Sequence, residues 1–122
     1  MSAGEPLPPD IHQRFKERFG VEILDGLGTT ELAHIAISNR PGCSVPGTSG
    51  TVVEGYEVSL RDESGEEVQD GEAGRLYVKG ESVMVGYWNR TDQTRQALSG
   101  AFLATGDTYI HCLLYTSDAA DD

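Results

Sequence analysis

The stretch Asp25-Gly26-Leu27-Gly28-Thr29-Thr30-Glu31 places two glycines, two hydroxyls and a carboxylate directly after the apolar run Val21-Glu22-Ile23-Leu24. Glycine lets a ligand approach the main chain closely, Thr hydroxyls can hydrogen-bond phosphate oxygens, and a carboxylate can hold Mg²⁺. Such a layout after a strand suits a nucleotide–metal site. The alternative is a strand over residues 21–24 that leads into a helix, with Thr29 or Thr30 as N-cap and Glu31 in the first turn. Taken alone, the stretch favours this structural alternative.

The composition of the chain limits the functions that it can have. The chain has 122 residues and a net charge of −11, which argues against nucleic acid or an anionic membrane surface as a partner. Hydrophobic residues make up 38% of the chain, and 15 glycines indicate a loop-rich mixed α/β or β structure. The sequence has no transmembrane run and no signal-peptide pattern, so we expect a cytoplasmic protein. Cys43 and Cys112 lack metal-ligand spacing, and a disulfide between them is not expected.

The first third of the chain predicts one amphipathic helix. Ile11, Phe15 and Phe19 are spaced four apart among charged residues, and Gly20 supplies the C-terminal stop. His12 lies among these charged residues and is expected to be solvated. The helix would then lead into the strand over residues 21–24.

The second half predicts an antiparallel β-meander with one buried face. Residues 56–61 and 75–79 alternate between apolar and polar side chains, after a turn-rich segment over residues 39–50. The acidic turns between the two strands are expected to be solvated loop tips without a catalytic role. Residues 92–98 predict a short helix capped by Thr91 or Asp92.

Two features are typical of ordinary structure when they are taken alone. His34 lies in the otherwise apolar run 32–37, which favours a core histidine bonded to a backbone carbonyl over a pocket ligand. Thr105-Gly106-Asp107 ends an apolar run and by itself predicts an ordinary turn.

The sequence changes character after Ile110. Residues 112–122, Cys-Leu-Leu-Tyr-Thr-Ser-Asp-Ala-Ala-Asp-Asp, look like the translation of a transposase-type sequencing adapter. We therefore expect a non-native tail here and exclude it from the fold. The alternative is a genuine acidic tail.

Several short motifs, weak individually, are specific in their order and spacing. The series resembles the adenylate-forming superfamily of acyl-CoA synthetases, adenylation domains and luciferases over residues 2–110. Within it, residues 25–35 followed by Ser38-Asn39-Arg40 are most similar to the benzoate-CoA ligase group. The motifs are Ser2-Ala3-Gly4-Glu5, Gly28-Thr29-Thr30-Glu31, Gly47-Thr48-Ser49-Gly50, Gly71-Glu72-Ala73-Gly74-Arg75-Leu76-Tyr77-Val78-Lys79-Gly80, Gly86-Tyr87-Trp88-Asn89 and Thr105-Gly106-Asp107.

The resemblance implies an α/β fold and roles for single residues. The chain would be part of the large N-terminal domain, with residues 1–40 ending an αβ nucleotide-binding subdomain and residues 41–111 forming a β-rich subdomain. Thr30 would bind the phosphate of ATP or of the acyl-adenylate, and Glu31 would hold Mg²⁺; these two are the implied catalytic residues. The remaining implied contacts are the adenine border (Ala3, Gly4, Glu5, Asp25 and Gly26), the ribose (Asp107) and the acyl pocket (Gly28, Ala33 and His34).

The implied reaction joins a carboxylate, ATP and CoA, with benzoate as the model acid. The resemblance departs from the wider family at Leu27, where an aromatic residue is common, and in lacking a tryptophan shortly before Thr-Gly-Asp. Family motifs for a phosphate loop, a hinge and a catalytic lysine are not found in the chain, so we expect an interior fragment with half an ATP site and almost no activity.

Two alternatives remain open from the sequence. The parent enzyme could be a ligase for another carboxylate or the adenylation module of a peptide synthetase, which the missing pocket residues would decide. A second alternative is a free-standing, non-catalytic acidic β-rich binding module. That module would unfold cooperatively, whereas a fragment would be poorly soluble because unpaired strands expose apolar faces.

Overall fold

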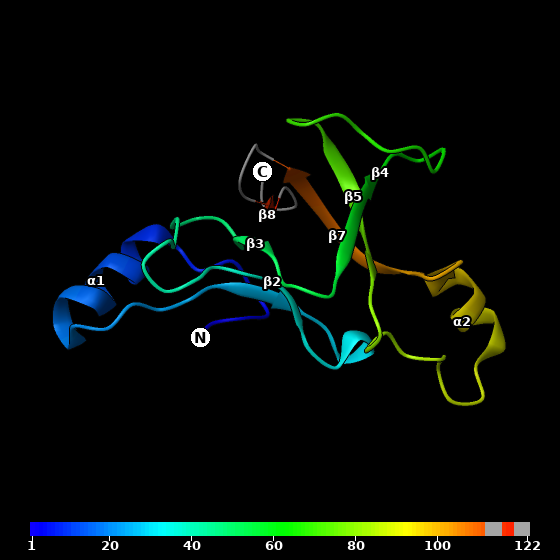
Figure 1. The fold of residues 1–122 in the computed structure, drawn as a ribbon, viewed down its shortest axis with the longest axis horizontal. Helices are drawn as coiled ribbons and strands as arrows, with labels where there is room; N and C mark the ends of the chain where they lie inside the picture. The colour runs from blue at the N-terminus through cyan, green and yellow to red at the C-terminus, as the bar shows by residue number, and fades with distance from the viewer. Residues whose placement is uncertain (112–115, 119–122) are drawn as a thin grey trace.

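The computed structural model describes residues 1–111 and 116–118 and confirms an α/β fold. Two helices lie at opposite ends of the long axis, with two antiparallel sheets between them (Figure 1). The predicted non-native tail and Cys112 lie outside the described residues, except for the short strand β8. The elements are α1 (Pro9–Phe19), β1 (Gly26–Gly28), the 3₁₀ turn η1 (Thr30–Leu32), β2 (Ile35–Ser38), β3 (Thr51–Val52), β4 (Glu57–Arg61), β5 (Ala73–Lys79), α2 (Thr91–Ala97), β6 (Leu98–Ser99), β7 (Phe102–His111) and β8 (Thr116–Asp118).

The predicted helix α1 is confirmed, but the side that it buries is not the expected one. Gly20 adopts φ +68° and its N–H donates to the Lys16 carbonyl at 2.8 Å, which ends the helix as predicted. His12 is only 5% exposed, with its Nε2 4.0 Å from Glu22 Oε1, so the expectation of a solvated histidine is wrong. Phe19 is 58% exposed instead.

The glycines of the Asp25–Glu31 stretch lie inside a strand rather than in a turn. The predicted strand over residues 21–24 is wrong, because strand pairing begins at Asp25 and continues through β1. Strand β1 pairs antiparallel with β2, and β2 pairs with β3 to complete a three-stranded sheet. A Cβ on Gly28 would lie 2.7 Å from the His34 carbonyl oxygen, so this close pairing requires glycine.

The larger sheet confirms the predicted meander. Its strand order is β4-β5-β7-β6, and β8 pairs with β7; all of these pairings are antiparallel. Along β5 the side chains alternate as predicted, with Leu76 and Val78 fully buried. On the outer face the Arg61 guanidinium lies between the rings of Tyr77 and Phe102, at 4.4 and 4.8 Å from their centroids.

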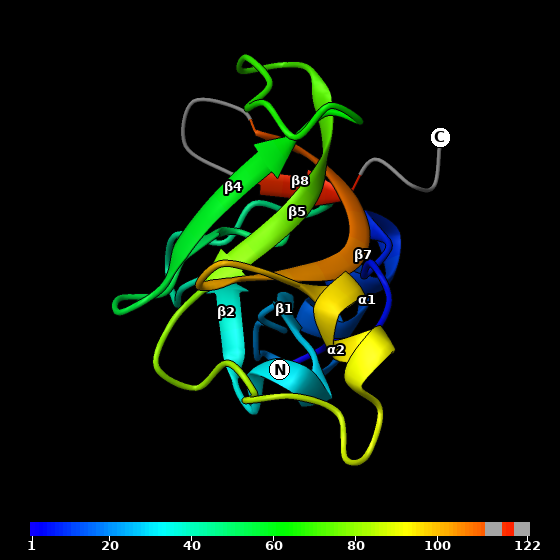
Figure 2. The same cartoon turned by 90° about the vertical axis from the view of Figure 1, so that its right-hand side faces the viewer.

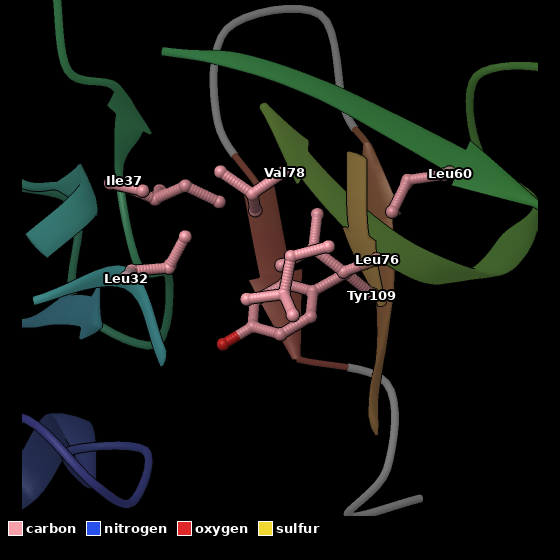
Figure 3. Close-up of a cluster of buried hydrophobic side chains, with 8 residues drawn as sticks. Leu32, Ile37, Leu60, Leu76, Val78 and Tyr109 are labelled. Carbon is pink, nitrogen blue, oxygen red and sulfur yellow. The ribbon is translucent and has the colours of Figure 1, made fainter. Parts of the chain in front are cut away.

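The hydrophobic core lies between the two sheets. Figure 3 shows Leu32 and Ile37 from the small-sheet side directed toward Val78 and Leu76 on the larger sheet. Leucine, valine and isoleucine side chains of this size contribute about 1.5–3 kcal/mol each when buried. This contact holds the two sheets against each other. Figure 2 shows the larger sheet next to β1 and β2. The subdomain boundary that we predicted at residue 40 stays a prediction. The small sheet has strands on both sides of this residue.

Helix α2 is confirmed over most of its predicted length, but its cap is different. Arg90 occupies the N-cap position without a side-chain cap, so the expected cap by Thr91 or Asp92 is wrong. Thr94 supplies the local order instead, because its hydroxyl accepts from the Tyr87 N–H at 2.9 Å and donates to the Arg90 carbonyl at 2.9 Å.

Asn39 organises the turn-rich segment over residues 39–50. Its side chain is buried, and its Nδ2 donates to the Thr48 carbonyl at 2.6 Å while its Oδ1 accepts from the Val45 N–H at 3.1 Å. Gly50 closes this segment at φ +97°, and a Cβ there would lie 2.3 Å from the Asn39 nitrogen. Only glycine combines that backbone conformation with that approach.

We therefore expect Gly50→Ala to destabilise the chain by at least about 2 kcal/mol, because overpacking adds to the cost of a positive φ. Gly55→Ala is the matched control, since Gly55 has φ +96° but nothing within 4 Å of a built Cβ. Urea unfolding of both variants measures the difference. Equal losses of stability would show that the contact with Asn39 contributes nothing.

Candidate functional site

A cleft of about 220 Å³ brings together segments that are far apart in the sequence. The N-terminal segment, strand β1 and the middle of β7 supply most of its walls. It gathers most of the residues that the family resemblance assigned to the nucleotide, and Ala3 lies next to them in the chain. The residues lining the cleft are Gly4, Glu5, Pro6, Asp25, Gly26, Leu27, Gly28, Thr29, Ser49, Thr105, Asp107 and Tyr109.

Asp25 fixes the N-terminal wall of this cleft. Ser2 forms a parallel bridge to Asp25, through Ser2 N to the Leu24 carbonyl at 2.8 Å and Gly26 N to the Ser2 carbonyl at 3.0 Å. Five residues later, the Leu7 N–H donates to Asp25 Oδ2 at 3.0 Å. The segment over residues 2–7 is thus attached at both ends, and its middle borders the cleft.

The Asp25 carboxyl group is 7% exposed as a residue, and burial raises its pKa above the usual value of 3.8. Hydrogen bonds from the main-chain N–H groups of Leu7 and Gly26 oppose this effect without cancelling it. The folded chain therefore holds the proton on Asp25 to a higher pH than the unfolded chain does.

This shift predicts how the stability difference between wild type and Asp25→Asn varies with pH. The folded state binds more protons than the unfolded state between the two pKa values, so stability from this group falls as pH rises through that window. Relative to Asp25→Asn, the wild type should lose stability as the pH rises above 3.8, the usual pKa of this group, and through its raised folded-state pKa. Urea unfolding across this range measures the trend, and a wild type that gains on the variant as pH rises would contradict it.

The Thr-Gly-Asp segment lies within strand β7, so the expectation of an ordinary turn is wrong. Gly106 has φ +86°, and the β5–β7 register shifts between Arg75 and Tyr77. The Thr105 hydroxyl donates to the Leu76 carbonyl at 3.0 Å and accepts from the Asp107 N–H at 3.3 Å. An irregularity of this kind bends a strand and redirects a side chain, and Asp107 here lines the cleft.

A second, open groove shares part of its lining with the cleft. It shares Gly28 and Thr29 with the cleft, so the two hollows have one wall in common. Thr30 and Glu31 lie in η1, for which Thr29 is the N-cap without a side-chain hydrogen bond. The full lining of this groove is Gly28, Thr29, Thr30, Glu31, Ala33, His34 and Ile35.

His34 lies in this groove and is exposed, so the expectation of a core histidine is wrong. Its Nδ1 is 2.8 Å from the Ile35 carbonyl oxygen. Its ring stacks on Tyr56 with centroids 6.2 Å apart and an interplanar angle of 18°. The predicted contact to a backbone carbonyl is present, but it is made at the surface of the groove.

Ser49, Tyr109 and Thr29 are among the cleft-lining residues to which the sequence analysis gave no role in the site. Ser49 and Tyr109 are both buried, with their hydroxyl oxygens 3.4 Å apart across the cleft wall. The Thr29 hydroxyl is buried and has no hydrogen-bond partner among the residues that the structure describes. Ser49 belongs to the Gly47-Thr48-Ser49-Gly50 motif, which was given no role, and Tyr109 follows Thr-Gly-Asp; their proximity in the fold places both in the cleft.

Comparison with known families identifies the class of protein to which this fold belongs. The family model described as "AMP-binding enzyme" matches residues 1–88, and the chain belongs to this family. No helix within residues 1–111 and 116–118 has the length and apolar character needed to cross a membrane.

Among curated relatives, a benzoate–CoA ligase of Thauera aromatica is 47% identical over 110 residues, covering 89% of this chain and 21% of that protein. A 4-hydroxybenzoate–CoA/benzoate–CoA ligase of Rhodopseudomonas palustris is 43% identical over 109 residues, covering 89% of the chain and 20% of that protein. The chain thus spans about a fifth of the length of the curated relatives that it matches.

Solved structures of CoA ligases are also similar to this chain. A benzoate CoA ligase from Burkholderia xenovorans LB400 matches with a TM-score of 0.92 and 47% identity, over 98% of this chain and 25% of that chain. An anthranilate CoA ligase in complex with anthranoyl-AMP matches with a TM-score of 0.93 and 44% identity, over 96% of this chain and 23% of that one. The predicted superfamily and fold class are therefore confirmed.

Proposed function

We propose that the chain forms part of the nucleotide and acyl site of an ATP-dependent, AMP-forming carboxylate–CoA ligase that acts on an aromatic acid such as benzoate. One observation carries the proposal: the cleft and the groove share a wall at Gly28 and Thr29. An acyl-adenylate has a nucleotide joined to an acyl group through one phosphate, and two hollows that share lining residues suit that shape. The aryl–CoA ligases among the relatives support an aromatic acid.

In this proposal the cleft takes the nucleotide. Asp107 accepts hydrogen bonds from the two ribose hydroxyls, since its two carboxylate oxygens suit a vicinal diol. Ala3, Gly4 and Glu5 border the adenine on one side, and Asp25 with Gly26 borders it on the other. The attachment of residues 2–7 to Asp25 supports this arrangement because it gives the adenine a fixed wall.

The groove takes the acyl group and the reacting phosphate. Thr30 hydrogen-bonds the phosphate from the exposed start of η1, next to the wall that the two hollows share. Gly28, Ala33 and His34 border the acid, with Ala33 at φ 58° presenting only a methyl group. These small neighbours leave room for a flat ring.

Glu31 fits a magnesium site by its chemistry. Mg²⁺ is usually held by one or two carboxylates together with substrate phosphates and water, so a single half-buried carboxylate beside Thr30 is sufficient. No group of three His, Cys, Asp or Glu side chains able to hold a metal occurs in the described part of the chain. When bound, the ion would neutralise charge that develops on phosphate oxygens.

The reaction needs no protein nucleophile. The carboxylate attacks the α-phosphorus of ATP to give the acyl-adenylate and pyrophosphate, and the CoA thiol then displaces AMP. The residues of this chain hold the nucleotide and acid in place and donate hydrogen bonds to the phosphate, which is the usual main source of catalysis in such steps. We further propose a cytoplasmic setting, with ATP, CoA and the acid as small-molecule partners and no nucleic acid or membrane partner.

The chain by itself should form no acyl-adenylate from benzoate and ATP, because it spans only about a fifth of its relatives' length. ATP–pyrophosphate exchange with the purified 122-residue chain measures this. Exchange above the protein-free background would contradict the expectation of half a site.

Restoring the missing part tests the function directly. Residues 2–111 would replace the matching segment of the Thauera aromatica ligase, which is 47% identical, and benzoate-dependent ATP–pyrophosphate exchange would be measured. Asp107→Ala should lower kcat/KM for ATP by roughly 10–100-fold, since it removes charge-assisted hydrogen bonds. Glu31→Gln should lower kcat more than KM for the acid.

The matched control in the chimera is Asp62→Asn, a surface carboxylate in the β4–β5 loop. It should leave exchange unchanged. A folded chimera with no benzoate-dependent exchange, or one equally active with Asp107→Ala, would count against the proposal.

A further inference from the structure

Tyr56 contacts the groove residue His34 from another part of the fold. It lies in the connection between β3 and β4, yet its ring stacks on His34 with centroids 6.2 Å apart and an interplanar angle of 18°. Stacked rings gain attraction from their contact and restrict each other's orientation. The β-rich half of the chain therefore contributes to the placement of a groove side chain.

Tyr56 is itself held on two sides. Its hydroxyl is 2.6 Å from Ser82 Oγ, and its ring lies where a Cβ on Gly80 would come within 2.5 Å of Cδ1 and 2.7 Å of Cε1. The absence of a side chain at Gly80 thus leaves the space that the tyrosine ring fills.

The segment that holds Tyr56 is also attached to η1. The Met84 N–H donates to the Glu31 carbonyl at 2.8 Å, and the Val83 N–H donates to the Gly80 carbonyl at 3.2 Å. Residues 80–84 therefore connect the Tyr56 ring to the turn that presents Thr30 and Glu31.

The contacts of His34 define which ring nitrogen carries the proton. A carbonyl oxygen can only accept a hydrogen bond, so the 2.8 Å contact to Ile35 places a proton on Nδ1. In the neutral ring, Nε2 is then an acceptor and is the nitrogen left for a ligand. Rotation of the ring away from Tyr56 would break the bond to Ile35 and release this preference.

We propose that Tyr56 is a positioning residue that holds the His34 ring in one orientation and in the Nδ1–H form. Ser82 and the space at Gly80 hold Tyr56 in turn. The identity of the ligand that meets Nε2 rests on the proposed function. The placement of the ring does not, and it can be measured on the chain itself.

The test is NMR of the full 122-residue chain labelled at its histidines, of which there are three. At a pH where the rings are neutral, His34 should show the Nδ1–H tautomer, and His34→Gln assigns its signals. Tyr56→Leu and Gly80→Ala should both return His34 to the tautomer mixture of a free histidine side chain. Tyr56→Phe should keep most of the Nδ1–H form because it preserves the ring, and Ser82→Ala should match Tyr56→Phe.

The buried His12 reports whether each variant is folded, because it lies in α1, away from the groove. If Tyr56→Leu also shifts the His12 signals, the His34 tautomer in Gly80→Ala, which is the smaller change, decides the test. A wild-type His34 in the Nε2–H form, or an unchanged Nδ1–H form in a folded Gly80→Ala or Tyr56→Leu variant, overturns the proposal.

A second readout separates this proposal from the ligase function. In the chimera with the Thauera aromatica enzyme, Tyr56→Leu should raise KM for benzoate by roughly 2–10-fold, with KM for ATP unchanged and activity restored by Tyr56→Phe. Loss of exchange in every chimera, with the expected NMR result on the chain, would reject the ligase function alone. A normal chimera with unchanged KM for benzoate in Tyr56→Leu would reject the role of Tyr56.

Discussion

Asp25 is the residue on which the arrangement of the cleft depends. Its carboxylate accepts from the Leu7 N–H at 3.0 Å, and its carbonyl accepts from the Asn39 N–H at 2.9 Å. The main chain on either side of it pairs with Ser2. One buried residue thus connects the N-terminal segment, β1 and the start of the turn-rich segment. Burial raises the pKa of this carboxyl group. The residue that joins the three segments is therefore harder to ionise than an exposed aspartate.

Contact between the sheets then brings the other half of the cleft to Asp25. Leu32 and Ile37 pack against Leu76 and Val78, which sets β7 beside β1 and places Asp107 in the same cleft. Because the core of the fold lies between the sheets, a change in core packing would move the two walls of the site relative to each other. The placement of the residues proposed to contact ribose and adenine therefore depends on core residues that lie outside the cleft.

The sequence predicted the parts of this structure that depend on local pattern. The alternation around Leu76 and Val78 predicted the meander, and Gly20 predicted the end of α1, because period and cap are properties of neighbouring residues. The strand at residues 21–24 was predicted wrongly because Gly26 and Gly28 favour a turn by propensity, whereas their missing side chains allow close pairing with β2. Most of the residues that the family resemblance assigned to the nucleotide line one cleft, and their roles stay predictions. Ser49 and Tyr109 line the same cleft, and Tyr56 contacts His34, only through tertiary contacts.

The orientation of α1 shows how the rest of the structure overrides local pattern. The stripe of Ile11, Phe15 and Phe19 predicts the buried face, yet Ile11 is 41% and Phe19 58% exposed while His12 is buried. Trp88 and Val85, at 95% and 99% exposed, lie far along the chain near the other helix. Burying such side chains normally contributes about 1.5–3 kcal/mol each, so a chain that leaves them in water gives up stability. Helix periodicity therefore identified side chains suited to burial, while the contacts within this chain bury His12 in their place. The candidate site shows a similar contrast. Asp25 and Asp107 are placed by contacts within the chain, whereas Thr30 and Glu31 line a groove that is open to solvent.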